Sequence, residues 1–233
     1  MDFYNEFKMY AMKHLGVSEM QFHSWDTMQN QIYGNSSVSS SLTPYILEER
    51  EMRVTQMDIF SRLMRDRILW LAGPVNDRMS TVVQAQLMFL DNVDSSEDIR
   101  LFIDSPGGSV KSGLSIVDMM NWVSPDIQTV CTGMAASMGS ILLGAGTKGK
   151  RSILPNSKVM LHQVSYGAQG HVLDVDISRN EALKYNEKLM KMLAEYSGQD
   201  LEKLKQDVNR DYWLEGEEAV AYGIVDKLQV KKS

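Results

Sequence analysis

The amino-acid sequence predicts an α/β fold built on a mainly parallel β-sheet. From residue 67 onward, short apolar runs rich in Val, Ile and Leu alternate with longer segments of helical periodicity, which is the pattern of βαβ units. The connections between them contain Gly, Pro, Ser or Asp at their bends. Consecutive strands are therefore expected to be joined by right-handed helical crossovers and to run parallel.

The expected elements follow in a regular order. Residues 42–55 combine an apolar start with a charged run, and no regular element is assigned to them. Strands are expected at 67–71, 99–103, 126–130 and 157–162, and helices at 57–64, 80–92, 109–122, 140–143 and 181–196. The carboxyl ends of the parallel strands should share one edge of the sheet, where folds of this class bind their ligands.

Composition is that of an ordinary globular protein and argues against several classes of partner. The chain has 233 residues, of which 43% are hydrophobic and 23% charged, which allows a sizeable core. A net charge of −6 argues against nucleic acid or an anionic membrane as a partner. Cys131 is the only cysteine and no run of 18 apolar residues is present, so we expect a cytoplasmic protein without disulfides.

The first 40 residues differ from the remainder of the chain. Aromatic and Met residues are scattered there without a core period, and residues 34–41 form a Gly- and Ser-rich linker. His14 and His23 lie in this segment, where surface histidines are expected rather than a metal site. We predict a removable extension over 1–40 and one domain over 41–233.

Ser137 lies in a stretch of small residues, 131–139, between an apolar strand and an apolar helix. A serine at a sharp strand-to-helix turn is exposed at the sheet edge, and the helix N-terminus beside it offers unpaired N–H groups for a developing negative charge. This is the setting of a nucleophilic serine. The small residues could equally serve only to pack a tight corner, and this stretch alone does not separate the two interpretations.

Two further features should lie at the same edge of the sheet as Ser137. The pair Gly107-Gly108 and His162 each follow a predicted strand, one strand–helix unit before and after the serine. His162 is a base that could take the Ser137 proton, and the glycines offer backbone N–H groups for an oxyanion and a track for an extended peptide. Each feature alone fits a plain turn or strand end, whereas the combination favours an enzyme. Cys131, at the end of an apolar strand, is expected to be buried rather than nucleophilic.

A catalytic Ser–His pair needs a carboxylate to orient the imidazole. Spacing does not choose among the acids that follow His162, namely Asp174, Asp176, Asp200, Asp207, Asp211 and Asp226. The first two lie at the start of a long helix, where acids usually stabilise the positive end of the helix dipole. Asp211 lies in a polar and aromatic loop, 209–213, that could return to the sheet edge.

Four motifs together resemble the ClpP family, the proteolytic subunits of the ATP-dependent Clp protease. They are Gly-Met-Ala-Ala-Ser-Met-Gly at 133–139, Asp-Ser-Pro-Gly-Gly at 104–108, residues 154–163, and Arg-Asp-Tyr at 210–212. The resemblance continues in register from about residue 41 to 228. It implies the ClpP/crotonase-like fold of repeated β-β-α or β-α units, with a protruding strand–helix handle at about 164–197.

The resemblance also implies roles for individual residues. Ser137 would be the nucleophile, His162 the general base and Asp211 the orienting acid, with the backbone N–H groups of Gly108 and Met138 as the oxyanion hole. The chain would be a serine endopeptidase without a cofactor. ATP would be used by the partner, because this chain has no phosphate-binding loop of the G-x-x-x-x-G-K type.

An assembly of two stacked heptameric rings is implied as well. The helix 181–196 would join the rings after a strand-like segment, 164–175, through apolar residues that include Tyr185, Leu189 and Met192. In the family, the Arg that corresponds to Arg210 pairs across the ring interface with an acid, and an acid often stands just before this Arg. Here that preceding position is Asn209. Either Arg210 pairs with another carboxylate such as Asp207, or the link between ring assembly and an aligned triad is weaker.

The implied partners are an AAA+ unfoldase of the Clp family and the unfolded proteins that it delivers. Met88, Phe102 and Trp122 supply apolar bulk where the unfoldase would dock, although Arg100 replaces a frequent tyrosine. Asp104 stands where the family usually has Asn, which could alter the oxyanion loop. The extension is longer than is typical, and its cleavage is expected between Ser40 and Ser41.

Two alternatives differ in class. A catalytically silent ring subunit would only dock a partner, and it predicts a broken triad, yet none of the three positions is broken. An acyl-CoA enzyme of the crotonase type would share the fold and a backbone oxyanion hole, but it would use acidic catalytic residues in place of a Ser–His pair.

Overall fold

The computed structural model of the chain describes residue 13, residues 45–50 and residues 53–230. The chain divides into two compact units, Met1–Asp66 and Arg67–Ser233, and each is considered by itself. The linker 34–41 and the expected cleavage site at Ser40 and Ser41 lie outside the described residues, as does the predicted extension 1–40 apart from residue 13.

The described part of the first unit is a β-hairpin followed by a short helix. Strands β1 (Tyr45–Arg50) and β2 (Arg53–Asp58) pair antiparallel. Helix α3 (Ile59–Arg65) begins where the Asp58 carboxylate accepts the N–H groups of Phe60 and Ser61 at 3.0 and 3.1 Å. The hairpin was not predicted, because the run of Glu and Arg at 48–51 has low strand propensity.

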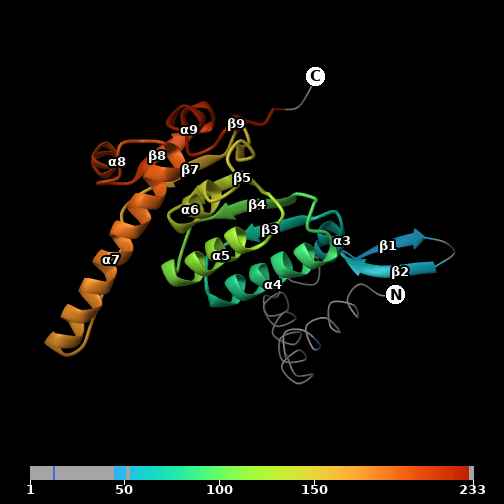
Figure 1. Cartoon of the computed structure of the whole chain (residues 1–233), viewed down its shortest axis with the longest axis horizontal. Coiled ribbons are helices and arrows are strands. Elements are labelled where there is room, and N and C mark those ends of the chain that lie inside the picture. The colour runs from blue at the N-terminus through green and yellow to red at the C-terminus, as the bar shows by residue number, and fades with distance from the viewer. Residues whose placement is uncertain (1–12, 14–44, 51–52, 231–233) are drawn as a thin grey trace. The chain divides into compact units, whose positions relative to one another are not determined.

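The second unit contains the parallel sheet, as predicted (Figure 1). Among the described residues the sheet has seven strands in the order β3-β4-β5-β6-β9, with β7 on β5 and β8 on β7. All pairs are parallel except β7–β8. The strands are β3 (Ile68–Ala72), β4 (Ile99–Ser105), β5 (Ile127–Ala136), β6 (Ser152–Ile153), β7 (Lys158–Leu161), β8 (Tyr212–Glu215) and β9 (Lys227–Leu228).

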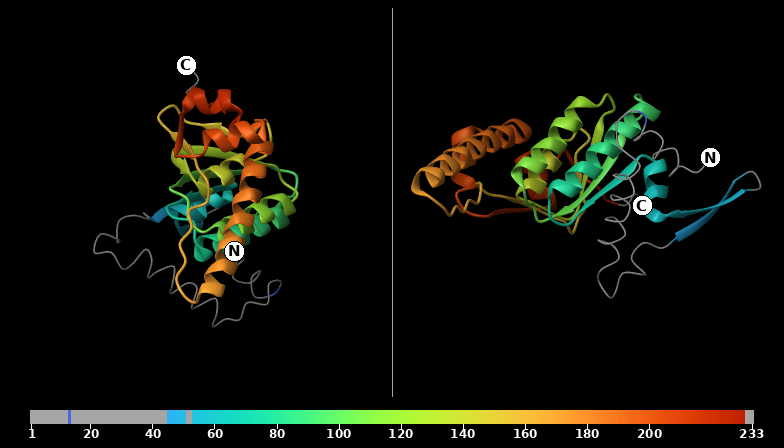
Figure 2. Two further views of the ribbon diagram at one scale, coloured as in Figure 1. Left: turned by 90° about the vertical axis from the view of Figure 1, so that its left-hand side faces the viewer. Right: turned by 90° about the horizontal axis from the view of Figure 1, so that it is seen from below.

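Helices connect these strands. They are α4 (Asp77–Val93), α5 (Val110–Trp122), α6 (Met138–Gly144), α7 (Val172–Ser197), α8 (Leu201–Asp207) and α9 (Gly216–Tyr222). Polar side chains cap the start of several of them, including Asn76 at α4, Ser109 at α5 and Asp200 at α8. Helices α4 and α5 lie side by side against the sheet (Figures 1 and 2).

Burial alternates along the first strands of the sheet. Leu69 and Leu71 on β3 and Leu101 and Ile103 on β4 are at most 2% exposed, whereas the residues between them face the other side. On that side Trp70 and Phe102 stack with ring centroids 5.0 Å apart. One face of these strands therefore belongs to the core, and the other carries an aromatic pair of which Trp70 is exposed and Phe102 half-buried.

Helix α7 extends away from the sheet, and residues 162–171 run beside it (Figures 1 and 2). The expected strand at 164–175 is not formed: residues 162–171 have no regular structure and Val172 already begins α7. The segment is instead attached to the helix, with the Val164 N–H donating to Asn186 Oδ1 at 2.9 Å. A strand requires a neighbour to pair with, and none of the described strands adjoins this segment.

Two buried arginines bind neighbouring loops of the second unit through hydrogen bonds and an ion pair. Arg67, which has a φ of 59°, donates hydrogen bonds to the carbonyls of residues 90, 94, 97 and 98 at 2.8–3.2 Å, in the last turn of α4 and just after it. Arg151, with 3% of its side chain exposed, pairs with Asp226 at 2.6 Å. Both arrangements satisfy a buried charge with several acceptors.

Candidate active site

Ser137 occupies a tight corner between β5 and α6. Strand β5 continues past the expected end at 130 to Ala136, and α6 begins at Met138. Ser137 has a φ of 54° and a ψ of −121°, a backbone conformation that is costly for a residue with a side chain. Gly107 packs directly against this corner, where a Cβ on Gly107 would lie 2.6 Å from Ser137 Cβ. The strained serine is therefore held in place by close packing.

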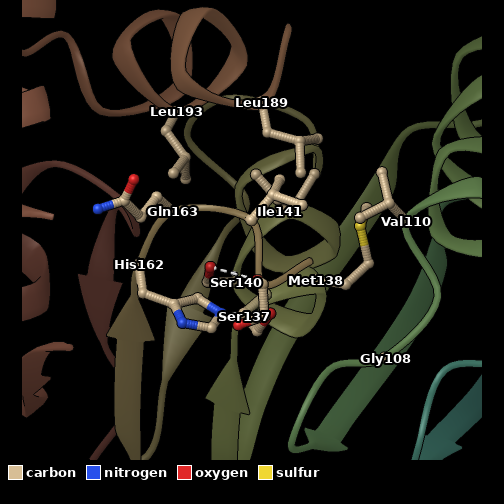
Figure 3. A pocket seen from close by; sticks show the side chains of 12 residues that line it. Gly108, Val110, Ser137, Met138, Ser140, Ile141, His162, Gln163, Leu189 and Leu193 are labelled. Carbon is tan, nitrogen blue, oxygen red and sulfur yellow. Dashed lines mark hydrogen bonds between the residues drawn. The ribbon is translucent and has the colours of Figure 1, made fainter. Parts of the chain in front are cut away.

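His162 follows β7 and points at Ser137 (Figure 3). Its Nε2 lies 2.7 Å from Ser137 Oγ. The parallel pairing of β7 with β5, in which Ala136 is opposite Met160, aligns the ends of the two strands, and the Ser137 N–H donates to the Met160 carbonyl at 2.9 Å. Because β5 and β7 end at the same edge of the sheet, the serine and the histidine are in contact, as expected from the order of elements.

Asp211 lies beyond the histidine. It precedes β8, whose antiparallel register with β7 sets Tyr212 opposite Leu161 and so brings Asp211 next to His162. The distance from His162 Nδ1 to Asp211 Oδ1 is 3.5 Å, and the Asp211 side chain is 63% exposed. This is an ion-pair distance, longer than a good hydrogen bond.

Three other acids considered in the sequence analysis have different partners. Asp200 caps α8, Asp207 binds Lys203 and the hydroxyl of Tyr222, and Asp226 binds Arg151. Asp211 is thus the member of that group that the structure brings to the imidazole.

Two backbone N–H groups beside Ser137 have no acceptor among the described residues, those of Gly108 and Met138. Gly108 has a φ of 149°, and a Cβ at this position would lie 2.3 Å from the Val75 carbonyl oxygen. Met138 is the first residue of α6, where N–H groups lack an intrahelical partner. A carbonyl oxygen bound at Ser137 could accept from both groups.

A pocket adjoins the pair and is lined by both apolar and polar side chains (Figure 3). Its lining includes Val110, Ile141, Leu189 and Leu193, as well as Gln163. The sequence analysis assigned none of these residues to the pocket, and it named Leu189 only as a ring contact. The available signal was spacing, since Ile141 lies one helical turn after Ser137 and Val110 opens the helix after Gly108.

The family model described as Clp protease matches residues 49–232 of this chain. The chain belongs to the Clp protease family. Curated relatives, each called ATP-dependent Clp protease proteolytic subunit, match nearly its whole length. The protein of Bacteroides fragilis strain YCH46 is 47% identical, and that of Bacteroides thetaiotaomicron 46%; each alignment covers 98% of this chain and 100% of the relative. The protein of Porphyromonas gingivalis is 44% identical over 97% of this chain and 98% of the relative.

These alignments bear on the N-terminal extension. Because they cover 97–98% of this chain and 98–100% of the relatives, an extension of this length occurs in other members of the Clp protease family. That the extension is longer than is typical of the family as a whole stays a prediction.

The residues expected to join the rings divide into two groups. Tyr185 is 36% exposed, but Leu189 is 6% exposed and lines the pocket beside Ser137. Leu189 therefore packs on its own domain, because the last turns of α7 lie against the body of the unit. The exposed apolar residues of α7 lie nearer its start: Val172, Leu173, Ile177 and Leu183.

The other expected contact residues lie at the surface or close to it. Asn209 and Arg210 are exposed, and the Asn209 carbonyl accepts from Gln163 Nε2 at 3.2 Å. Within the chain, Asp207, the alternative partner for Arg210, binds Lys203 and Tyr222. Of the expected docking residues, Trp122 is 79% exposed, whereas Met88 and Phe102 are half-buried.

The surroundings of Cys131 and Asp104 fit a structural role for these residues and not a catalytic one. Cys131 is fully buried, and burial, with a contribution from the nearby Asp104 charge, raises the pKa of its thiol to about 12, which makes it a poor nucleophile. The Asp104 carboxylate accepts the Met134 N–H at 3.1 Å, at an irregularity where β4 pairs with β5. The acid that replaces the family's usual Asn thus contacts β5, and its side chain makes no hydrogen bond to the described residues 105–109.

Within the described residues, no group of three or more His, Cys, Asp or Glu side chains could hold a metal ion. The same residues include no helix with the length and apolarity that a membrane span requires.

Proposed function

We propose that the chain is the proteolytic subunit of an ATP-dependent Clp protease and hydrolyses peptide bonds as a serine endopeptidase. The observation that carries this proposal is the 2.7 Å contact between Ser137 Oγ and His162 Nε2, at a corner where two backbone N–H groups have no acceptor among the described residues. Membership of the Clp protease family supports the same activity.

In the proposed mechanism, Ser137 Oγ attacks the carbonyl carbon of the scissile peptide while its proton passes to His162 Nε2. The negative charge that develops on the carbonyl oxygen is stabilised by the N–H groups of Gly108 and Met138. One such donor typically contributes about 3 kcal/mol to transition-state stabilisation. The C–N bond then breaks, and the leaving amine takes the proton from His162.

The acyl-enzyme is released by the reverse proton path. His162 takes a proton from water, which attacks the ester carbonyl, and returns it to Ser137 Oγ as the C–O bond breaks. Asp211 would orient the imidazole and stabilise its protonated form. At 3.5 Å the acid needs only a small approach to form a hydrogen bond, and such contacts often tighten when substrate binds.

The wider assembly belongs to the same proposal. Two stacked heptameric rings would enclose the sites, and an AAA+ unfoldase would use ATP to feed unfolded proteins to them in the cytoplasm. The relatives' shared description as subunits of an ATP-dependent protease supports the partnership. Removal of residues 1–40 between Ser40 and Ser41 is part of this proposal as well.

The direct test is covalent labelling of the full chain with a fluorophosphonate, followed by peptide mapping, together with hydrolysis of a fluorogenic peptide. We expect one adduct on Ser137 and a loss of kcat of about 10⁶-fold in Ser137→Ala. His162→Ala should lose a similar amount, since the two groups act as a unit.

Ser115→Ala is the matched control, since this hydroxyl lies on α5 and bonds only to the Lys111 carbonyl among the described residues. It should label and hydrolyse like the wild type. Hydrolysis retained within tenfold in Ser137→Ala would refute the proposed nucleophile. A wild-type chain that neither labels nor hydrolyses would indicate a silent subunit.

A further inference from the structure

The loop that carries Gly108 is held from behind by the connection between β3 and α4. The Val75 N–H donates to the Gly107 carbonyl and the Val75 carbonyl accepts the Ser109 N–H, both at 2.8 Å. These bonds flank Gly108 in a parallel bridge, in which the residue between the bonded groups points its own N–H to the other side. The free N–H of Gly108 is thus aimed by its neighbours.

Beyond this bridge, a chain of hydroxyl groups leads from Ser109 to an acid on α4. Ser112 Oγ lies 2.8 Å from Ser109 Oγ and 2.5 Å from Asp77 Oδ1. An ionised carboxylate can only accept, so Ser112 donates to Asp77 and Ser109 donates to Ser112. Asp77 thereby fixes the direction of both hydroxyl groups. Ser112 is 2% exposed, so without Asp77 its O–H would lose a partner inside the protein.

The same turn of α5 also contacts the second N–H donor. Gly113 packs against the Met138 side chain so closely that a Cβ on Gly113 would lie 2.2 Å from Met138 Cγ. A shift in the start of α5 would therefore displace Gly108 through Ser109 and Met138 through Gly113. Both donors depend on one short segment, 109–113.

We propose that Asp77 is a positioning residue for the oxyanion hole. Its carboxylate, acting through Ser112 and Ser109, anchors the start of α5 and so sets the distance of the Gly108 N–H from the reacting carbonyl. The position suits an acid, since Asp77 is the first residue of α4 and negative charge is favourable at a helix N-terminus. The inference rests on the proposed peptidase function.

The test is steady-state kinetics of the full-length chain with Asp77→Ala and Asp77→Asn. Active sites are counted by complete fluorophosphonate labelling, so that misfolded chains do not enter kcat. We expect kcat per labelled site to fall about tenfold in Asp77→Ala with KM unchanged, less than the loss of a whole donor. Asp77→Asn keeps an acceptor for the Ser112 hydroxyl and should stay within about twofold of the wild type.

A peptide aldehyde provides a readout that a purely structural role would not move. Its adduct with Ser137 places an oxygen in the oxyanion hole, so its affinity follows transition-state stabilisation. We expect its dissociation constant to rise in Asp77→Ala by the same factor by which kcat/KM falls.

Asp91→Ala is the matched control. Asp91 Oδ1 accepts the Ser124 N–H at 3.2 Å, which joins the far end of α4 to the segment just after α5. Its kcat and aldehyde affinity should equal those of the wild type. If Asp77→Ala does not fold, Ser112→Ala breaks the same chain of hydroxyl groups and should show the tenfold loss. Where both fold, the double variant should lose no more than either single variant.

Kinetics and aldehyde affinity in Asp77→Ala equal to those of Asp91→Ala would overturn the inference, as would wild-type values in Ser112→Ala. A wild type that does not label at Ser137 is a different result, since it removes the proposed function itself.

Discussion

At the scale of single residues, Arg151 brings a positive charge into the interior of the second unit. Its guanidinium donates to both carboxylate oxygens of Asp226 and to the carbonyls of residues 144, 196 and 223. Burial alone would raise the pKa of Asp226, but the hydrogen bonds and charge of Arg151 outweigh it and hold that pKa below its usual value. The pair joins the loop at 149–151 to the C-terminal segment.

We predict that Asp226→Asn destabilises the folded chain by about 3 kcal/mol at pH 7, because a buried arginine is left without its counter-charge. The folded pKa of Asp226 is depressed, so its contribution is present above the unfolded carboxyl pKa of about 4 and is lost as the pH falls through the folded value. The difference between wild type and variant should therefore shrink in acid. Urea unfolding followed by circular dichroism at pH 7 and pH 3 measures both effects.

Lys191→Ala serves as the control for this prediction, since it removes only an exposed ion pair with Glu187, a type of contact worth less than about 1 kcal/mol. An Asp226→Asn variant as stable as this control at pH 7 would contradict the prediction.

Individual site residues differed in how far the sequence could predict them. Ser137 and His162 each follow a strand directly, so the order of elements was enough to bring them together. Asp211 depends on the antiparallel register of β8 with β7, which no local pattern specifies, and only the family resemblance selected it. Asp77 was missed because its partner Ser112 lies 35 positions away, on a helix whose packing decides the contact.

At the scale of elements, α7 combines two surfaces. Its last turns bury Leu189, Met190 and Leu193 in the body of the unit, while Leu173 and Ile177 near its start are 76% and 63% exposed. Exposed apolar side chains in this number typically mark a contact with another protein. The proposed ring-to-ring contact thus belongs to the first half of α7.

We predict that the double variant Leu173→Asp and Ile177→Asp separates the two rings, because it places charges in an apolar contact. Sedimentation velocity should show single rings or smaller species in place of a tetradecamer. Asn180→Asp adds a charge at another exposed position on the helix and should leave the assembly intact. An unchanged tetradecamer in the double variant would remove α7 from the contact.

Regular periodicity predicted the main elements well, and the failures have physical causes. Helices α4, α5, α6 and α7 were predicted from their apolar residues, whereas the short helices α8 and α9 were not. The hairpin β1–β2 was missed since its charged residues lack strand propensity. The strand at 164–175 was expected from the resemblance, but a strand needs a neighbour, and the segment lies along α7 instead.

At the scale of the whole molecule, the proposed assembly depends on residues beside the catalytic triad. Asn209 accepts from Gln163, the residue after His162, and Arg210 comes directly before Asp211. Within the chain, Asp207 Oδ2 binds Lys203 and the hydroxyl of Tyr222, and a pairing of Asp207 with Arg210 across a ring interface stays a prediction. In a ring contact, Arg210 would face an uncharged Asn209 at the position where an acid is expected.

We predict that Asn209→Asp stabilises the tetradecamer and raises basal peptidase activity, because a carboxylate binds an arginine more strongly than an amide does. A gain of about 1 kcal/mol corresponds to about a fivefold change in the population of the active state. Sedimentation at decreasing protein concentration and peptide hydrolysis measure the two effects. Asn209→Ala should show neither gain. The prediction fails if Asn209→Asp changes nothing while Arg210→Ala loses both assembly and activity.

The close packing around Ser137 also divides the site into parts that evolution can and cannot alter. At Gly107, Gly108 and Gly113 even one added carbon would come too close to a neighbouring residue. Any substitution at these positions therefore disturbs the packing around Ser137. Val110, Ile141 and Leu193 instead line the pocket with side chains, so a change in their size changes the shape of the pocket wall. Descendants of this gene can therefore acquire new cleavage preferences through the pocket wall while the glycine framework stays the same.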